Sequence, residues 1–168
     1  MADWAAIVRE HGPKAFQTAW RILGHVQDTE DAVQEALLEA LRTYRKEKVQ
    51  NWGGLLRQAT TRRALDRLRK RRRSLAIREA AIHARDEFPE AMAEARELAT
   101  WLRAVLAQLS ERQAEVFSLR YFAEMANPEI AATLDISVDA VAVALHKARA
   151  NIAEKWREAN HDVRSEQR

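Results

Sequence analysis

A run of basic residues from Arg57 to Arg73 constrains the fold of this chain more than any other feature. Nine of these residues are Arg or Lys, the one acid among them is Asp66, and the run ends in five consecutive cations. So dense a positive charge cannot be buried, and its self-repulsion is relieved best by an anionic partner such as a phosphate backbone. A solvated helix end is the plain structural alternative. Asp66, four residues from both Arg62 and Lys70, is expected to form intrahelical ion pairs.

The composition favours helix along nearly the whole chain. Its 168 residues include only four Gly and three Pro, and no segment alternates as a strand would. This length fits one domain or two small ones. The absence of cysteine excludes a disulfide framework and a thiolate metal site. Since no apolar segment is long enough for a membrane span or a signal peptide, we expect no membrane insertion and a cytoplasmic protein.

Caps and helix breakers predict about four helices in the first half. We expect a helix from Ala2 to Glu10, a break at Gly12-Pro13, and a second helix that runs to Leu23 and ends at Gly24. Asp28 or Thr29 then caps a helix over residues 30–44. Its predicted buried stripe consists of Val33, Leu37, Leu41 and Tyr44.

The fourth predicted helix carries the basic run. Asn51 is expected to cap it, and Gly53 and Gly54 to soften its first turn. Its apolar residues do not fall on one stripe, so we expect this helix to make tertiary contacts on more than one side.

Residues 74–97 lose the helical periodicity and mark a boundary. The segment Asp86-Glu87-Phe88-Pro89 interrupts any continuous helix, because proline restricts the residue before it. Helix is expected to resume by about Glu90, with Trp101 at the edge of the next buried face. That face is predicted to contain Leu98, Leu102, Val105, Leu106 and Leu109.

The second half has the sequence signals of a helix-turn-helix. Ser110 and Gln113 match a capping box, Asn127-Pro128 a cap followed by proline, and Ser137 a third cap. The short helix over residues 128–134, its turn, and the long helix from Val138 form the motif, whose second helix enters the DNA major groove. A plain helical hairpin remains the alternative. The residues of the long helix expected to face inward are Val141, Leu145, Ala148 and Ile152.

Several motifs in series resemble the bacterial sigma factors of the extracytoplasmic-function type, in the sigma-70 family. They are the segment from Asp28 to Ala36, the Ala64-Leu65-Asp66 within the arginine-rich helix, and Leu109 to Gln113 followed by Glu129-Ile130-Ala131. The resemblance covers roughly residues 10–156. It implies an all-α protein with two small helical domains joined by a linker. The boundaries expected are 1–73 for sigma region 2, 74–97 for the linker, 98–160 for the helix-turn-helix of region 4, and 161–168 for a polar tail.

The resemblance also implies the partners and their contacts. Core RNA polymerase would bind Asp31, Gln34 and Glu35, an exposed acidic and amide face beside a hydrophobic stripe. Promoter DNA would be opened by the first domain and held upstream by the second, while the linker threads the polymerase. An anti-sigma factor is a further candidate partner.

Residues on and before the basic helix would bind the melted minus-ten element. Lys46, Lys48, Asn51 and Trp52 lie in and beside the loop that captures an unstacked base, although Trp52 is at least as well suited to anchor the core. The arginines flanking the melted strand would mostly hold phosphates, which fix position without reading sequence. They are Arg57, Arg62, Arg63 and Arg67.

The recognition helix departs from the family pattern. Related proteins commonly carry a Thr-Val-Lys-Ser-Arg-Leu-like segment where this chain has residues 140–145, Ala-Val-Ala-Val-Ala-Leu. Small apolar side chains can touch a thymine methyl but cannot make bidentate bonds to a base, so we expect weak or thymine-dependent reading of the minus-thirty-five element. Lys and Arg in place of Ala142 and Ala144 should raise the affinity for upstream DNA. The groove side is predicted to consist of Asp139, Ala140, Val143, Ala144, His146, Lys147 and Arg149.

Nothing in the sequence favours catalysis. The five histidines are scattered, and the chain has neither a His-Glu-x-x-His pair nor a glycine loop for phosphate. We therefore predict a protein that is not an enzyme and that uses no cofactor and no metal. Two alternatives to an initiation factor remain: a freestanding helix-turn-helix repressor, and a degenerate sigma relative that acts as an interaction protein.

Overall fold

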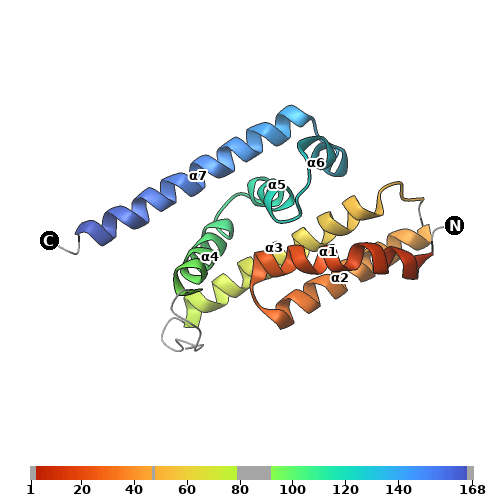
Figure 1. Cartoon of the computed structure of the whole chain (residues 1–168), viewed down its shortest axis with the longest axis horizontal. Helices are drawn as coiled ribbons and strands as arrows, with labels where there is room; N and C mark the ends of the chain where they lie inside the picture. Colours follow the sequence, from red (N-terminus) through yellow and green to blue (C-terminus); the bar gives the residue numbers. More distant parts are fainter. Residues whose placement is uncertain (1–2, 47, 79–91, 166–168) are drawn as a thin grey trace.

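The computed structural model describes residues 3–46, 48–78 and 92–165, with side chains for 3–46, 48–74 and 92–161. The described chain is all helical, as predicted, and contains no strand (Figure 1). Its helices are α1 Trp4–Leu23, α2 Val26–Lys46, α3 Trp52–Arg78, α4 Ala93–Leu106, α5 Glu111–Tyr121, α6 Asn127–Leu134 and α7 Val138–Ser165. The predicted interruption at Asp86 to Pro89, and the predicted restart at Glu90, lie outside the described residues.

Helix α1 continues through Pro13, so the predicted break there is wrong. The proline is exposed, whereas Ile7, Ala15, Ala19 and Ile22 are buried along one face. An interior proline costs a helix about 3 kcal/mol, but apolar burial on both sides of it, where α1 packs along α2 and α3, outweighs that cost. The predicted end at Gly24 is confirmed: this glycine has φ 62°, and its N–H donates to the Trp20 carbonyl.

Helix α2 begins at Val26, four residues earlier than predicted. His25 takes the place of the expected Asp28 or Thr29 cap, because its Nδ1 accepts a 3.4 Å hydrogen bond from the Asp28 N–H. Thr29 is buried and donates its hydroxyl to the His25 carbonyl at 2.7 Å. The predicted buried stripe is also partly wrong, since its members Leu37, Leu41 and Tyr44 are only half-buried. The buried face carries smaller side chains, which allow α2 to approach its neighbours closely: Thr29, Ala32, Val33, Ala36 and Ala40.

Helix α3 is the element on which the two halves of the molecule meet. Asn51 caps it as predicted, with Oδ1 accepting a 2.8 Å hydrogen bond from the Gly54 N–H. One side of α3 packs on α1 and α2 and another on α5 and α6, which confirms the expected contacts on more than one side. Asp66 pairs with Arg69 at 3.9 Å instead of the predicted Arg62 or Lys70, because Arg62 turns toward α5.

Helices α4 to α7 form the second half, and α6, the turn and the start of α7 make the predicted helix-turn-helix (Figure 1). The Ser137 cap is confirmed by a 3.0 Å hydrogen bond from the Ala140 N–H. The capping box at Ser110 is half formed, since Ser110 accepts from the Gln113 N–H but the Gln113 side chain accepts from Asn151. Asn127 is the first residue of α6 and not its cap, because Ala126 occupies the cap position.

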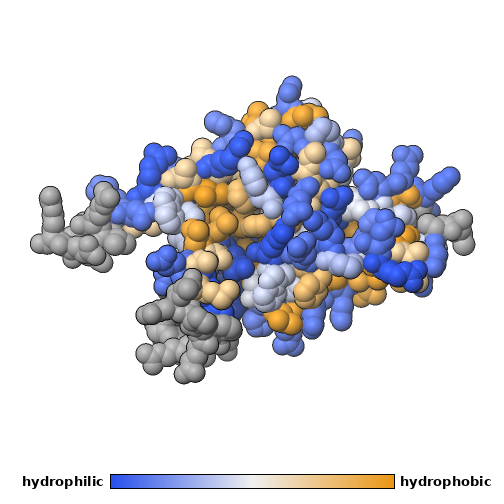
Figure 2. All heavy atoms as spheres, viewed as in Figure 1, coloured by the Kyte–Doolittle hydropathy of each residue, from blue (hydrophilic) through white to orange (hydrophobic). Residues whose placement is uncertain are grey.

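Apolar residues of α4 pack against the rest of the second half. Val105, Leu106 and Leu109 are buried as predicted, but Leu98 is 49% exposed and lies off the buried face. Trp101 packs edge-on against Trp156, with ring centroids 4.9 Å apart. Figure 2 shows hydrophobic residues gathered where α4, α5 and α7 meet, within a mostly hydrophilic surface.

One hydrophobic core spans both halves of the chain. It joins Ile22 of α1 and Leu65 and Leu68 of α3 to Leu106 and Phe117 of the second half. A second cluster, centred on Met125, Ile130, Val141 and Leu145, holds the helix-turn-helix together. The two halves are therefore packed as one body in this structure.

Candidate polymerase and nucleic-acid interfaces

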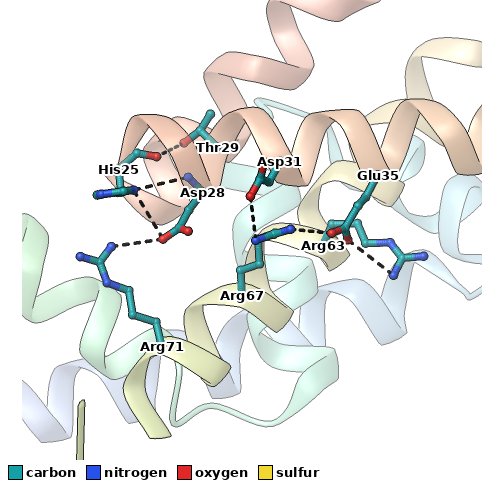
Figure 3. A network of polar contacts seen from close by, with 8 residues as sticks. All are labelled: His25, Asp28, Thr29, Asp31, Glu35, Arg63, Arg67 and Arg71. Carbon is teal, nitrogen blue, oxygen red and sulfur yellow. Dashed lines mark hydrogen bonds and ion pairs between the residues drawn. The ribbon is translucent and has the colours of Figure 1, made fainter. Parts of the chain in front are cut away.

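A seam of ion pairs runs between α2 and α3 (Figure 3). Because the two helices are antiparallel, carboxylates spaced along α2 meet arginines spaced along α3 in reverse order. We call this set the α2–α3 seam; its pairs are Arg71–Asp28 at 3.5 Å, Arg67–Asp31 at 3.4 Å, Arg67–Glu35 at 2.5 Å, Arg63–Glu35 at 4.0 Å and Arg63–Glu39 at 2.9 Å.

The seam joins residues that the sequence assigned to different partners. Arg67 bridges Asp31 and Glu35, so two of the predicted polymerase contacts are paired with a predicted DNA contact. Arg63 sits between Glu39 and Glu35, and its hydrogen bond to Glu39 raises its pKa. The side chains of Asp31 and Glu35 remain 47% and 45% exposed, so a basic partner can still reach their carboxylates from the solvent side. Gln34 is exposed beside them.

The other two predicted minus-ten arginines face the second half of the molecule. Arg62 Nε lies 2.8 Å from Glu115 Oε1 of α5, and Arg57 Nη2 lies 4.0 Å from Glu129 Oε1 of α6. Arg57 also donates from Nε to the Gly53 carbonyl at 3.0 Å. The four arginines thus divide into a pair on the α2–α3 seam and a pair held by α5 and α6.

The predicted base-capture residues differ in their surroundings. Lys46 and Lys48 are exposed, and Asn51 uses its side-chain oxygen as the α3 cap. Trp52 packs against Trp4 and Tyr44, with ring centroids 6.1 and 5.7 Å away. This aromatic cluster gives Trp52 a structural role, the one that the sequence reading already favoured.

The recognition helix presents most of the predicted groove-side residues. Its exposed positions include Asp139, Ala140, Val143, His146, Lys147 and Arg149. Ala144 is a correction: it is 7% exposed and belongs to the core of the helix-turn-helix, so it cannot reach a groove. The inward residues Val141, Leu145 and Ala148 are buried as predicted, and Ile152 is half-buried. Position 144 lies three residues after Val141 and four before Ala148, so its spacing already placed it on the buried stripe.

Three carboxylates for which no binding role was predicted complete these surfaces. They are Glu115 of α5, Glu124 in the turn after α5, and Glu129 of α6. Glu124 Oε1 lies 2.8 Å from Arg21 of α1, and its other oxygen pairs with Lys14. The hydrogen bonds from Lys14 and then Arg21 lower the pKa of Glu124 to about 2. Glu124 has a φ of 57°, which is typical of a constrained turn. No pattern in the sequence predicts that Glu124 lies beside α1.

Two family models match this chain in order along the sequence. Sigma-70 region 2 matches residues 7–74, and sigma-70 region 4 matches residues 99–152. The chain belongs to the sigma-70 family. It is a sigma factor of the extracytoplasmic-function type. A freestanding helix-turn-helix repressor does not account for the region 2 match.

Two curated relatives agree with this assignment. The chain is 28% identical over 156 residues to the ECF RNA polymerase sigma factor SigE of Mycolicibacterium smegmatis, covering 89% of this chain and 60% of that protein. It is 26% identical over 170 residues to the ECF RNA polymerase sigma factor SigW of Bacillus subtilis, covering 92% of this chain and 89% of that protein. The chain thus spans less than two thirds of the first relative and most of the second.

Two solved structures share the fold. CnrH in complex with the cytosolic domain of CnrY superposes with a TM-score of 0.61 at 22% identity, over 92% of this chain and 88% of that chain. The sigma factor RpoE of Bartonella quintana in complex with the anti-sigma factor NepR gives a TM-score of 0.58 at 18% identity, over 92% of this chain and 96% of that chain. Within the part of our chain that the structure describes, no helix is both long and apolar enough to cross a membrane.

Proposed function

We propose that this sigma factor binds core RNA polymerase in the cytoplasm and directs it to promoters, where it helps to open the DNA. The observation that supports this proposal best is the presence, in order, of region 2 with its charged α2 and α3 and of region 4 with its helix-turn-helix. The working boundaries are region 2 at 1–73, a linker at 74–97, region 4 at 98–160 and a polar tail at 161–168.

The exposed edge of α2 is the proposed contact with core polymerase. Asp31, Gln34 and Glu35 lie on one side of the helix, and the two carboxylates are only partly screened by Arg67. Such half-exposed ion pairs contribute little to folding, typically about 0–1 kcal/mol. Their carboxylates can therefore exchange Arg67 for a cation on the polymerase at small cost.

The proposed DNA contacts lie on α3 and α7. In region 2, the arginines of α3 would hold phosphates of the melted strand, with Lys46 and Lys48 nearby. In region 4, the exposed side of α7 carries Lys147, Arg149 and His146, which can bind phosphate, while Ala140 and Val143 can contact only apolar groups such as a thymine methyl. We therefore propose that the minus-thirty-five element is held weakly and read mainly through thymines.

An anti-sigma factor is the proposed regulatory partner. Both solved relatives are described as complexes with another protein, and for the Bartonella protein that partner is named as an anti-sigma factor. Exposed apolar side chains of α1 and α5, Trp20 and Tyr121, offer such a partner a contact surface.

Binding to core polymerase tests the docking surface. We expect Glu35→Gln to weaken the affinity for core polymerase, measured by fluorescence anisotropy, because it removes a charge from the proposed contact. Glu30→Gln is the matched control, since Glu30 is exposed on the same helix and has no ion pair among the described residues. Equal affinity for the two variants, or the absence of core binding by the unaltered protein, would contradict this docking.

A second candidate function rests on the apolar recognition helix. Val138 and Val143 are 45% and 53% exposed on α7, which suits a protein contact better than a DNA groove. In that case the chain would be a degenerate sigma relative that acts as an interaction protein. Binding to core polymerase without any promoter opening would identify it.

A further inference from the structure

The contact between regions 2 and 4 is made of charges as well as apolar side chains. Three carboxylates of region 4 face cations of region 2: Glu115 faces Arg62, Glu129 faces Arg57, and Glu124 faces both Lys14 and Arg21. We call these the cross-region ion pairs. Every one of them joins a negative group of region 4 to a positive group of region 2.

Two of the cations engaged in this way are the proposed DNA contacts of α3. Arg62 uses its Nε for Glu115 at 2.8 Å, and the Glu115 side chain is only 11% exposed, so this pair lies at the contact itself. A cavity of about 490 Å³ opens beside it, lined by residues of α3 and α5. A carboxylate placed against an arginine that would hold a phosphate occupies the same charge-assisted contact. Region 4 therefore covers part of the DNA surface of region 2.

The remaining contacts hold the regions together around those pairs. Glu124 joins the turn after α5 to α1, and Arg21 also donates a 2.8 Å hydrogen bond to the Phe122 carbonyl. Arg72 of the basic run donates to the Ala104 carbonyl of α4 at 2.8 Å. The shared core between Leu65, Leu106 and Phe117 closes the interface. Helix α3 also approaches α6 closely, since a Cβ at Gly54 would stand 2.9 Å from the Thr133 hydroxyl.

We propose that region 4 is an intramolecular competitor for promoter DNA: its glutamates at positions 115, 124 and 129 hold region 2 in a closed arrangement, and two of them, Glu115 and Glu129, occupy Arg62 and Arg57 of α3 until nucleic acid displaces them. This inference rests on the proposed DNA contacts of α3. A protein in the closed arrangement binds DNA with an affinity reduced by the fraction of open molecules. Loss of the ion pairs raises that fraction, so free sigma factor gains affinity for DNA.

The variant that tests this proposal replaces the three glutamates together: Glu115→Gln, Glu124→Gln and Glu129→Gln. Glutamine keeps the shape of each side chain and can still accept the Ala126 N–H hydrogen bond that Glu129 accepts in the α6 cap. The charge-matched control is Glu97→Gln, Glu154→Gln and Glu158→Gln. These three glutamates are exposed on α4 and α7 and take part in no cross-region pair within the described residues.

The first measurement is the distance between the regions in the full chain. Because the protein has no cysteine, Gln17→Cys in α1 and Ala150→Cys in α7 give two unique positions for a donor and an acceptor dye. We expect high energy transfer for the unaltered sequence and for the control, and lower transfer for the triple variant. Equal transfer in all three proteins would overturn the closed arrangement as something that these glutamates maintain.

The second measurement is the affinity for a fluorescein-labelled single-stranded DNA of mixed sequence, without polymerase. Ion pairs with at least one exposed partner are individually weak, so the triple variant should bind about 3- to 30-fold more tightly than the unaltered protein. The control should change far less, although it carries the same net charge. Equal gains in the triple variant and the control would overturn the proposal, because charge alone would then explain them.

Glu124→Gln alone guards against a folding artefact, since this side chain is exposed and its loss does not disturb a core. It should give a smaller change in the same direction in both measurements, and no change in either would count against the proposal. The proposed function is judged separately by binding to core polymerase, a readout that neither measurement uses. A protein that binds core normally but shows no effect of the triple variant refutes only the intramolecular competition.

Discussion

Arginine at position 144 of α7 should destabilise the protein, whereas arginine at position 142 should not. Ala144 is 7% exposed and packs in the cluster that includes Ile130, Val141 and Leu145, while Ala142 is exposed on the same helix. The two positions receive the same side chain two residues apart. The comparison therefore isolates burial from charge and from helix propensity.

The magnitude follows from the burial of the side chain. A guanidinium at position 144 would be placed among apolar side chains, which include Ile130, Val141 and Leu145. Leaving a charge unpaired in a core costs about 3–5 kcal/mol, and partial escape of the long side chain to solvent moves the cost toward the lower end. For a chain of this size each kcal/mol shifts Tm by about 2–4 °C, so Ala144→Arg should lower Tm by roughly 6–20 °C. Ala142→Arg should stay within about 0.5 kcal/mol of the unaltered protein.

Thermal unfolding followed by circular dichroism measures both variants. DNA binding provides a second readout, because Ala142→Arg adds a cation to the groove side and should steepen the salt dependence of upstream DNA binding by about one phosphate contact. Unchanged Tm for Ala144→Arg, or a large loss for Ala142→Arg, would refute the orientation of α7 described above.

Three further predictions concern stability. Leu106→Ala should cost about 2–5 kcal/mol in urea unfolding, because Leu106 is fully buried in the core shared by both regions; a cost below 1 kcal/mol would contradict that core. Gly24→Ala should cost about 1–2 kcal/mol by the same assay, because φ is 62° and the new Cβ would stand 2.4 Å from Arg103 Cζ; an unchanged midpoint would argue against this turn. Glu124 has its pKa lowered from 4.5 to about 2 by Lys14 and Arg21, so its stabilising effect is complete above about pH 4.5 and is lost as the pH falls through about 2. The Tm difference between the unaltered protein and Glu124→Gln should shrink over that window, and a difference that grew toward low pH would reverse the assigned sign.

The sequence predicted well those features that depend on neighbouring residues. The caps at Asn51 and Ser137 and the left-handed end at Gly24 each rest on a side chain or a backbone preference within four residues. The helix-turn-helix followed from the same signals. At these helix ends the local hydrogen bonds are compatible with the tertiary packing, so the local preference decides the structure.

The errors arose where packing overrides local preference. Pro13 was expected to break a helix that burial on both sides keeps continuous, and the buried face of α2 uses small residues instead of the larger Leu37 and Leu41. Ala144 was placed outward by comparison with a cationic family segment, against its own helical spacing. In each case the neighbouring helices of the chain, and not the segment itself, determine which residues are buried and where the helix continues.

The cross-region ion pairs could not be predicted from the sequence. Arg62 and Glu115 are 53 residues apart, and Lys14 and Glu124 are 110 residues apart. No short-range pattern relates such positions, and the abundance of charged residues gives each arginine many equally plausible partners. The sequence identified the arginines of α3 as DNA contacts but not the glutamates that face them.

We propose that this sigma factor directs core RNA polymerase to specific start sites. The most direct test is in vitro transcription with purified core polymerase on a fragmented genomic library, with sequencing of the RNA 5′ ends in the presence and absence of the protein. We predict discrete starts that depend on the protein and share an upstream motif rich in thymine. If no such starts form although the protein binds core polymerase, promoter opening is refuted and the chain is an interaction protein.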